Sequence, residues 1–206
     1  MTEAARTTRE WQELDRAHHV HPFTDPKAFA DKGVRVITRA EGVYVWDSEG
    51  NRILDGMAGL WCVNVGYGRR ELVEAATRQL EVLPYYNNFF HSATPSQIDL
   101  GQALSEVTPA GLKHFFYANS GSEANDTVIR IARHFWRLQG KPDKRAFIGR
   151  SLGYHGSTLA AVSLGGMPHM HAFDKVLLPG FEHITHPHWY TQGADLTREE
   201  IGRAHV

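Results

Sequence analysis

Apolar residues recur at intervals of three and four along three stretches of the chain. Residues 69–83 carry such a stripe, and Pro84 ends it. Residues 95–107 carry a second stripe. The third lies in residues 121–138, at Ala124, Val128, Ile131, Phe135 and Leu138. Because these intervals place apolar side chains on one face of a helix, the pattern predicts three amphipathic helices.

A period of two replaces the helical spacing between residues 34 and 55. Val43 and Val45 alternate with Tyr44 and Trp46, which favour strands. Turn residues separate the apolar segments at 41–42 and 48–51. This part of the chain is therefore predicted to form a small antiparallel meander of three strands.

From residue 69 onward the predicted helices alternate with short apolar runs. The runs at residues 115–117 and 144–150 are predicted to be buried strands, and the alternation indicates an α/β layer with a largely parallel sheet. A turn of small residues follows each run. Because ligands of such sheets bind beyond the carboxyl ends of the strands, we expect the two turns to meet at one ligand site.

The first of these turns leads directly into a helix. Ser120 and Glu123 have the S-x-x-E spacing of a capping box, which fixes the helix start. The free N–H groups and the dipole of a helix N-terminus suit an anion. Gly121 allows close approach to the backbone, and Ser120 and Ser122 add hydroxyl donors. The alternative is an ordinary capped helix that binds nothing.

Two further stretches combine aromatic residues with irregular spacing. Residues 56–68 contain four glycines among apolar and aromatic residues, which is typical of a buried loop that lines a site. Trp61 within it is either a core residue or a substrate contact. Residues 85–91 contain four aromatic rings, a composition typical of a pocket wall or a subunit contact.

Histidines are numerous, at 13, and some of them cluster. His18, His19 and His21 form one group, and residues 183–188 contain a second. Neither group has a carboxylate or cysteine at a metal-ligand spacing. We therefore predict polar loops rather than metal sites.

Composition and charge exclude several classes of protein. The 206 residues are 42% hydrophobic with a net charge of −1, so no basic excess favours nucleic acid or an anionic membrane. The single cysteine, Cys62, excludes an internal disulfide framework and fits a reducing compartment. No stretch approaches the length of a membrane span or a secretory signal. These features predict a cytoplasmic protein.

Taken together, four motifs resemble those of the class III pyridoxal-phosphate aminotransferases, which have fold type I. They lie at residues 54–61, 85–90, 119–126 and 153–158. The resemblance covers about residues 10 to 200 and is strongest to the omega-amine or beta-alanine:pyruvate transaminases. It implies an N-terminal segment, residues 1–68, that contributes to the small domain and the active-site entrance. Residues 69–200 would be the first part of the large cofactor-binding domain.

The resemblance also implies roles for individual residues. Ser120, Gly121 and Ser122 match the turn that binds the phosphate of pyridoxal 5'-phosphate. Tyr154 matches the ring that stacks on the pyridine, and His155 supports it. The residues that match the substrate pocket are Leu60 and Trp61 in its wall, Phe23 at its entrance, and Phe89 and Phe90, which reach the site of the neighbouring subunit in a homodimer.

The reaction implied is a two-stage amino transfer from an amine or omega-amino acid to a keto acid, with pyruvate as the expected acceptor. The family's Schiff-base lysine and its aspartate under the pyridine nitrogen come from strands beyond residue 206, so no catalytic residue lies in this chain. We therefore expect this N-terminal portion alone to be inactive, and insoluble or molten, because a parallel sheet that lacks strands exposes an edge and an apolar face.

The last six residues, 201–206, do not continue the preceding helical pattern. They equal the translation of a common sequencing adapter, and we interpret them as a non-native tail.

Two alternatives to this function remain open from the sequence. One is a class III aminotransferase with a different donor, such as taurine, a diamine or another amino acid. The other is a non-catalytic module that binds pyridoxal phosphate or another phosphate.

Overall fold

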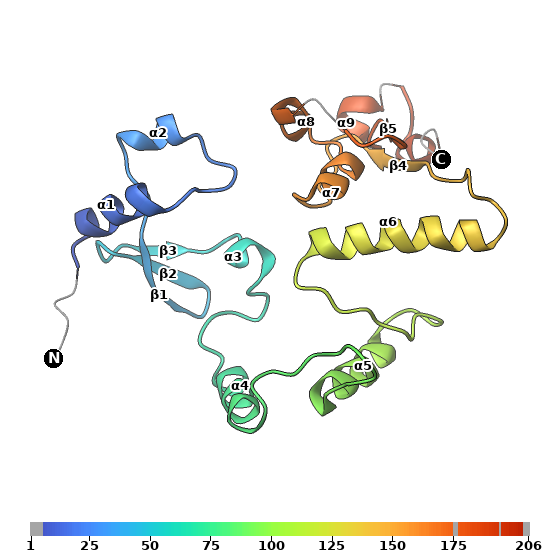
Figure 1. Cartoon of the computed structure of the whole chain (residues 1–206). Helices are drawn as coiled ribbons and strands as arrows, with labels where there is room; N and C mark the ends of the chain where they lie inside the picture. The colour runs from blue at the N-terminus through green and yellow to red at the C-terminus, as the bar shows by residue number, and fades with distance from the viewer. Residues whose placement is uncertain (1–5, 175–176, 194, 204–206) are drawn as a thin grey trace. The chain divides into compact units, whose positions relative to one another are not determined.

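The computed structural model describes residues 6–174, 177–193 and 195–203. The chain divides into two compact units, one extending to Thr94 and the other beginning at Pro95 (Figure 1). Each unit is described by itself below. The sequence analysis predicted a domain boundary after residue 68. That boundary refers to the domains of the complete fold, and it stays a prediction.

The first unit contains the predicted antiparallel meander. Its strands are β1 (Ile37–Glu41), β2 (Tyr44–Asp47) and β3 (Arg52–Leu54), paired in chain order. The buried Asp47 organises the turn between β2 and β3 by accepting the backbone N–H of Glu49 at 3.0 Å and that of Asn51 at 2.9 Å. Hydrogen bonds, above all from the Asn51 side chain, lower the pKa of Asp47, so this turn is held by a charged carboxylate.

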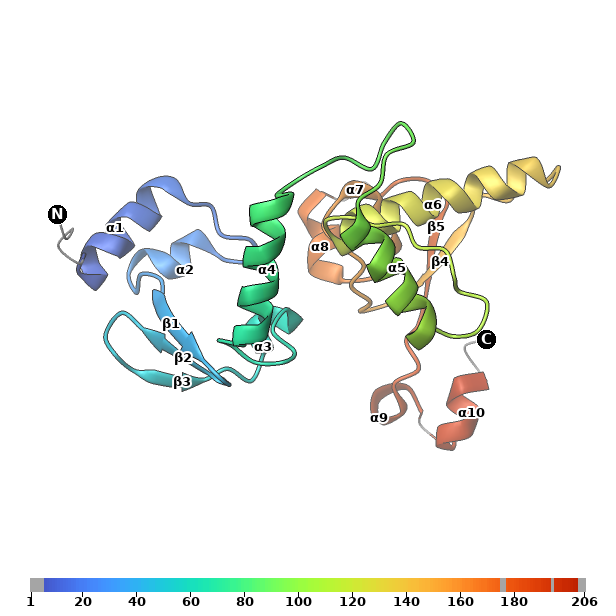
Figure 2. The ribbon, with the colours of Figure 1, turned by 90° about the horizontal axis from the view of Figure 1, so that it is seen from below.

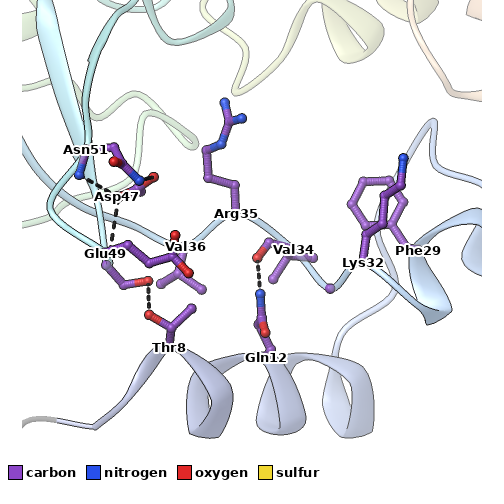
Figure 3. A pocket seen from close by; sticks show the side chains of 12 residues that line it. Thr8, Gln12, Phe29, Lys32, Val34, Arg35, Val36, Asp47, Glu49 and Asn51 are labelled. Carbon is purple, nitrogen blue, oxygen red and sulfur yellow. Dashed lines mark hydrogen bonds between the residues drawn. The ribbon is translucent and has the colours of Figure 1, made fainter.

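Two helices precede the meander, α1 (Thr8–His18) and α2 (Pro26–Ala30). Thr7 and Glu10 form a complete capping box at the start of α1. Gln12 Nε2 donates to the carbonyl of Val34 at 2.9 Å, and the hydroxyls of Thr8 and Ser48 lie 2.8 Å apart (Figure 3). These bonds tie α1 to the start and the turn of the meander, and a cavity of about 540 Å³ lies between them.

The meander is followed by α3 (Ala58–Trp61) and α4 (Arg70–Val82). The predicted helix at 69–83 is thus confirmed to within a residue at each end. Residues 56–68 were predicted to form a buried loop. The prediction of burial was wrong for Leu60 and Trp61 at the centre of this stretch, which are exposed. α3 is a single distorted turn in which Leu60 has φ +62°, and Trp61 keeps 76% of its surface exposed.

The second unit has a helical first half and a mixed second half. Its helices are α5 (Pro95–Val107), α6 (Gly121–Leu138), α7 (Leu159–Leu164), α8 (Pro168–Asp174), α9 (Trp189–Gln192) and α10 (Arg198–Arg203). Its strands, β4 (Phe147–Arg150) and β5 (Phe181–Ile184), pair in parallel with Phe147 opposite Phe181. The predicted helices at 95–107 and 121–138 and the parallel sheet are confirmed, whereas the sequence did not reveal α8 and α9.

α7 packs against α6 on one side and against β4 and β5 on the other, as Figures 1 and 2 show. The hydrophobic side chains buried in the described chain are Ile129 on α6, Ala161 on α7 and Phe181 on β5. Ser163, fully buried on α7, accepts the N–H of Leu178 at 3.0 Å. This small core fixes α6 relative to the sheet.

Two sequence predictions for this unit were wrong. Residues 115–117 were predicted to be a buried strand, yet they form no strand and Phe116 is 70% exposed. The described chain offers no neighbouring strand there, and an isolated extended segment has no ladder hydrogen bonds to make it a strand. Residues 201–206 were predicted to break the helical pattern, but α10 continues to Arg203. Residues 204–206 lie outside the described residues, and the non-native origin stays a hypothesis.

Within the described residues, none of the helices is both long enough and apolar enough to cross a bilayer.

Candidate functional site

The N-terminus of α6 differs from an ordinary capping box. Ser120 has an extended backbone, and its Oγ accepts the N–H of Glu123 at 3.2 Å, as predicted. The Glu123 carboxylate, however, accepts the N–H of Asn119 at 2.9 Å, one residue before the position that a capping box requires. In the part of the chain that the structure describes, no acceptor is found for the N–H groups of Gly121 and Ser122. These donors are therefore open to an anion.

The loop at residues 153–158 packs directly against this helix start. The backbone N–H of Ser157 donates to Ser122 Oγ at 3.0 Å. Gly156 has φ +130°, and a Cβ placed on it would lie 2.4 Å from Ser122 Oγ and 2.8 Å from the Cβ of Ala161. The two turns that the sequence predicted to converge do meet, and glycine at 156 makes the close approach possible.

Two side-chain contacts farther along α6 hold the loop in place. Asn125 Nδ2 donates to the carbonyl of His155 at 2.6 Å. The hydroxyl of Thr158 donates to Asp126 Oδ1 at 2.9 Å. The sequence analysis did not assign Asn125 and Asp126 a role, although two adjacent polar residues beside an apolar helix stripe were a signal. Both are half-buried, so these bonds satisfy groups that water reaches only in part.

Tyr154 and His155 lie on the same loop. Tyr154 retains 51% of its surface, so a face of its ring is accessible to a ligand. His155 is half-buried, and its backbone is anchored to α6 through Asn125. The stacking role of Tyr154 and the supporting role of His155 stay predictions.

The residues predicted for the substrate wall lie in the first unit. Leu60 and Trp61 both have positive φ, at +62° and +66°, and both are exposed. Trp61 is therefore not part of the core that the described residues form. The carboxylate of Asp55 supports this turn by accepting the N–H of Gly59 and the hydroxyl of Tyr67, each at 2.7 Å.

These donors make Asp55 a charged anchor. The Tyr67 hydroxyl is the main cause that lowers the pKa of Asp55, and the Gly59 N–H adds to it. The sequence analysis assigned neither Asp55 nor Tyr67 to the site. The available signal was an aspartate that directly follows a strand and precedes a glycine-rich turn.

Phe23, Phe89 and Phe90 are also exposed in the first unit. Phe90 keeps 93% of its surface and has φ +55°, and Phe23 keeps 67% with φ +52°. The Phe89 N–H donates to Asn87 Oδ1 at 2.9 Å, which shapes the turn before Phe90. Because these rings belong to the first unit and the phosphate turn to the second, a shared pocket stays a prediction.

Two cavities among the described residues of the first unit contain none of the predicted site residues. The larger, of about 540 Å³, is lined by both cationic and anionic side chains, Lys32 and Arg35 against Asp47 and Glu49 (Figure 3). The smaller, of about 220 Å³, includes His19 and His21 in its wall. The statement that no carboxylate accompanies this histidine group was wrong, because Asp15 hydrogen-bonds both imidazoles.

Comparisons with known proteins decide the family. The family model described as "Aminotransferase class-III" matches residues 28–204. The chain belongs to the class III aminotransferases. It is 58% identical over 195 residues to the putrescine–pyruvate aminotransferase of Pseudomonas aeruginosa, covering 95% of this chain and 43% of that protein. It is 41% identical over 170 residues to the mitochondrial gamma-aminobutyrate transaminase 1 of Oryza sativa subsp. japonica, covering 82% of this chain and 33% of that protein.

Solved structures place this class III chain in the same fold. An (S)-enantioselective omega-transaminase from Thermomicrobium roseum superposes with a TM-score of 0.93 at 42% identity, over 98% of this chain and 45% of that one. The omega transaminase of Pseudomonas jessenii in complex with PMP gives 0.91 at 37% identity, over 94% and 43%. The predicted fold, type I of the pyridoxal-phosphate enzymes, is confirmed. The chain spans less than half the length of these relatives.

Proposed function

We propose that this chain is part of a longer enzyme that uses pyridoxal 5'-phosphate to transfer an amino group from an amine or omega-amino acid donor to pyruvate. The observation that carries the proposal is the contact between the α6 N-terminus and the 153–158 loop. There Ser122 Oγ accepts the Ser157 N–H while the N–H groups of Gly121 and Ser122 remain available.

The chemistry of this site fits the phosphate of the cofactor. Two backbone N–H groups and the Ser122 hydroxyl lie in the first turn of an 18-residue helix, at the positive end of its dipole. The nearby carboxylates leave the two N–H groups open, because Glu123 accepts the N–H of Asn119 and Asp126 accepts the hydroxyl of Thr158. When bound, pyridoxal phosphate supplies the electron sink that amino transfer needs. The accessible Tyr154 ring would cover one face of its pyridine.

Two lysines of the second unit, Lys141 and Lys144, lie against Trp136, far along α6 from the proposed phosphate site. Lys144 Nζ lies 3.4 Å from the centre of the Trp136 ring. Trp136 is 16 residues along α6 from Ser120, which is about 24 Å at 1.5 Å per residue. Lys141 also lies over Trp136, and Lys175 lies outside the described residues. The resemblance to the class III aminotransferases implies a Schiff-base lysine beyond residue 206, and we therefore expect the chemical step to need residues that this chain does not contain.

The exposed aromatic residues support an apolar substrate site. Leu60, Trp61 and Phe23 would form its wall and entrance, with Phe89 and Phe90 contributed by the other subunit of a homodimer. Rings exposed by 67% to 93%, as at Phe23, Phe89 and Phe90, are typical of surfaces that another element covers. Such walls favour amines with an apolar body and no carboxylate beside the amine.

A diamine is the second candidate donor. It is favoured by the 58% identity to a putrescine–pyruvate aminotransferase. Aromatic rings also attract the distal ammonium of a diamine by cation–π contact. Trp61 would therefore contact a donor with an apolar body through hydrophobic packing, and a diamine through a cation–π interaction.

The proposal is tested in the longer protein, purified with pyridoxal phosphate. A yellow protein that loses its visible absorbance on borohydride treatment and keeps the cofactor covalently attached, and which forms alanine from pyruvate with an amine donor, would support it. A panel of aromatic amines, beta-alanine, gamma-aminobutyrate and putrescine then ranks the donors. A protein that binds the cofactor without a borohydride-trapped bond would be a non-catalytic module, and the proposal would be wrong.

A further inference from the structure

A compact group of metal-ligating side chains lies apart from the residues assigned above to the phosphate site and the substrate walls. Asp15 is on the last turn of α1, His19 caps the end of that helix, and His21 follows two residues later. These residues precede the range that the family model matches, which begins at residue 28. Their arrangement is therefore not accounted for by the amino-transfer site.

The three side chains converge on a small volume. His19 Nδ1 lies 3.1 Å from Asp15 Oδ1, and His21 Nε2 lies 2.9 Å from each Asp15 oxygen. One ligand atom from each residue lies within 4.8 Å of the other two. Ligand atoms at about 2.05 Å from a tetrahedral zinc ion are about 3.3 Å apart. An ion would thus spread the two Asp15–histidine contacts by a few tenths of an ångström and draw together the two histidine nitrogens, which lie within 4.8 Å of each other.

The surroundings hold these ligands in place. The backbone N–H of His19 donates to the carbonyl of Asp15 at 2.8 Å, which fixes the helix end. The His21 ring stacks on Phe29 with a centroid separation of 6.5 Å and an interplanar angle of 16°. All three ligands line the cavity of about 220 Å³, which leaves room for an ion and its remaining waters.

The charge balance also suits a cation. The Asp15 carboxylate accepts hydrogen bonds from both imidazoles and brings the acidic ligand of the group. Among the described basic side chains, no lysine or arginine forms an ion pair with Asp15. Two imidazoles and one carboxylate are nitrogen and oxygen ligands that first-row divalent ions such as Zn²⁺ prefer.

We propose that Asp15, His19 and His21 bind a divalent transition-metal ion of the Zn²⁺ class, with water completing its coordination. Their ligand atoms already lie within 4.8 Å of one another in a cavity that admits the ion. The ion would tie the end of α1 to the segment that leads to Phe23. This role is structural and independent of the amino-transfer reaction.

The test measures Zn²⁺ affinity in the longest soluble form of the protein, by competition with a chromophoric chelator. Wild type is expected to bind one ion that His19→Ala and His21→Ala each weaken by more than about 100-fold. Even residues that only support a ligand are worth about 10- to 100-fold in affinity. Co²⁺ in place of Zn²⁺ should give visible absorption bands of a four- or five-coordinate site.

His18→Ala is the matched control, since His18 is a neighbouring histidine on α1 that does not belong to the group. It should bind Zn²⁺ as wild type does. Circular dichroism of each variant, without metal, checks that the helix is retained. If wild type binds no more tightly than His19→Ala, or if His18→Ala loses the ion equally, the three residues are only a hydrogen-bonded helix end and the proposal is wrong.

Discussion

The two regions assigned to the active site are built differently. In the second unit, the start of α6 and the 153–158 loop are locked together by bonds from Ser157, Asn125 and Thr158. In the first unit, Trp61 and Phe90 project with 76% and 93% of their surfaces exposed. The proposed phosphate site is thus held together by bonds within the second unit, whereas the proposed substrate walls project into solvent.

The difference has a physical origin. A phosphate site needs backbone donors and small residues, which a helix start and an adjacent loop supply locally. A substrate wall needs aromatic rings that other elements of the protein cover. Most of the free energy that stabilises such a wall comes from burying those rings. We therefore expect substitutions in the second unit to affect stability and those in the first to affect substrate choice.

Gly156→Ala should have the largest effect. Its Cβ would approach Ser122 Oγ within 2.4 Å on a backbone with φ +130°. Strain and overpacking together should cost about 2–5 kcal/mol of unfolding free energy. Denaturant unfolding of the longer protein measures it. Gly121→Ala is the control, because nothing lies within 4 Å of its added Cβ, and its change should stay within about 0.5 kcal/mol. Equal effects of the two variants would contradict the tight contact.

Asn125→Ala should have the next largest effect. It leaves the half-buried carbonyl of His155 without its 2.6 Å donor, which should cost about 1–2 kcal/mol of unfolding free energy. The exposed Asn88, changed to Ala as a control, should alter stability by no more than about 0.5 kcal/mol. An unfolding curve of Asn125→Ala that overlays wild type would show that the loop is not held by this bond.

Asp55 provides a pH test of the Trp61 turn. Because its pKa in the folded protein is lowered by Tyr67 and Gly59, the carboxylate stabilises the turn at pH above its unfolded value of about 3.9. That contribution should be lost as the pH falls further, through the lowered folded pKa. The measurement compares tryptophan fluorescence and stability of wild type and Asp55→Asn between pH 6 and about 2.5. The variant should lose this part of the acid dependence, and an unchanged profile would contradict the anchor role.

Trp61→Ala should have the smallest effect on stability. A side chain that is 76% exposed contributes little to the core, so the change in unfolding free energy should be within about 0.5 kcal/mol. The kcat/KM values for aromatic amines and for putrescine should nevertheless change relative to each other. A large loss of stability with an unchanged donor ranking would place Trp61 in a core instead.

The sequence predicted the helices and the meander because their apolar periods are strong and local. α4 and α6 begin and end within a residue or two of the stripes that predicted them. It failed at residues 115–117, where an apolar run alone cannot show whether a neighbouring strand exists. The local pattern left the choice between core residue and substrate contact open at Trp61, since exposure depends on what covers a ring and not on the ring itself.

The candidate site was predictable to the extent that its signal was local. The S-x-x-E spacing located the start of α6, and the small-residue turn at 153–158 located its partner. The contacts of Asn125, Asp126 and Asp55 were not predictable, because each joins residues through the fold or through a turn of unusual backbone geometry. The Asp15 group escaped notice because its carboxylate lies one helical turn before His19 and only the fold brings His21 back to it.

The most direct test of the proposed phosphate site compares two ligands that differ only in the phosphate. Affinities for pyridoxal phosphate and pyridoxal are measured by absorbance in the longer protein, for wild type, Ser122→Ala and the control Ser105→Ala, whose residue lies on α5. Loss of a charge-assisted hydrogen bond should weaken pyridoxal phosphate about 10- to 100-fold in Ser122→Ala and leave pyridoxal unchanged. Ser105→Ala should match wild type for both ligands. Equal affinities of wild type and Ser122→Ala for pyridoxal phosphate, or an equal loss for both ligands, would contradict the assignment.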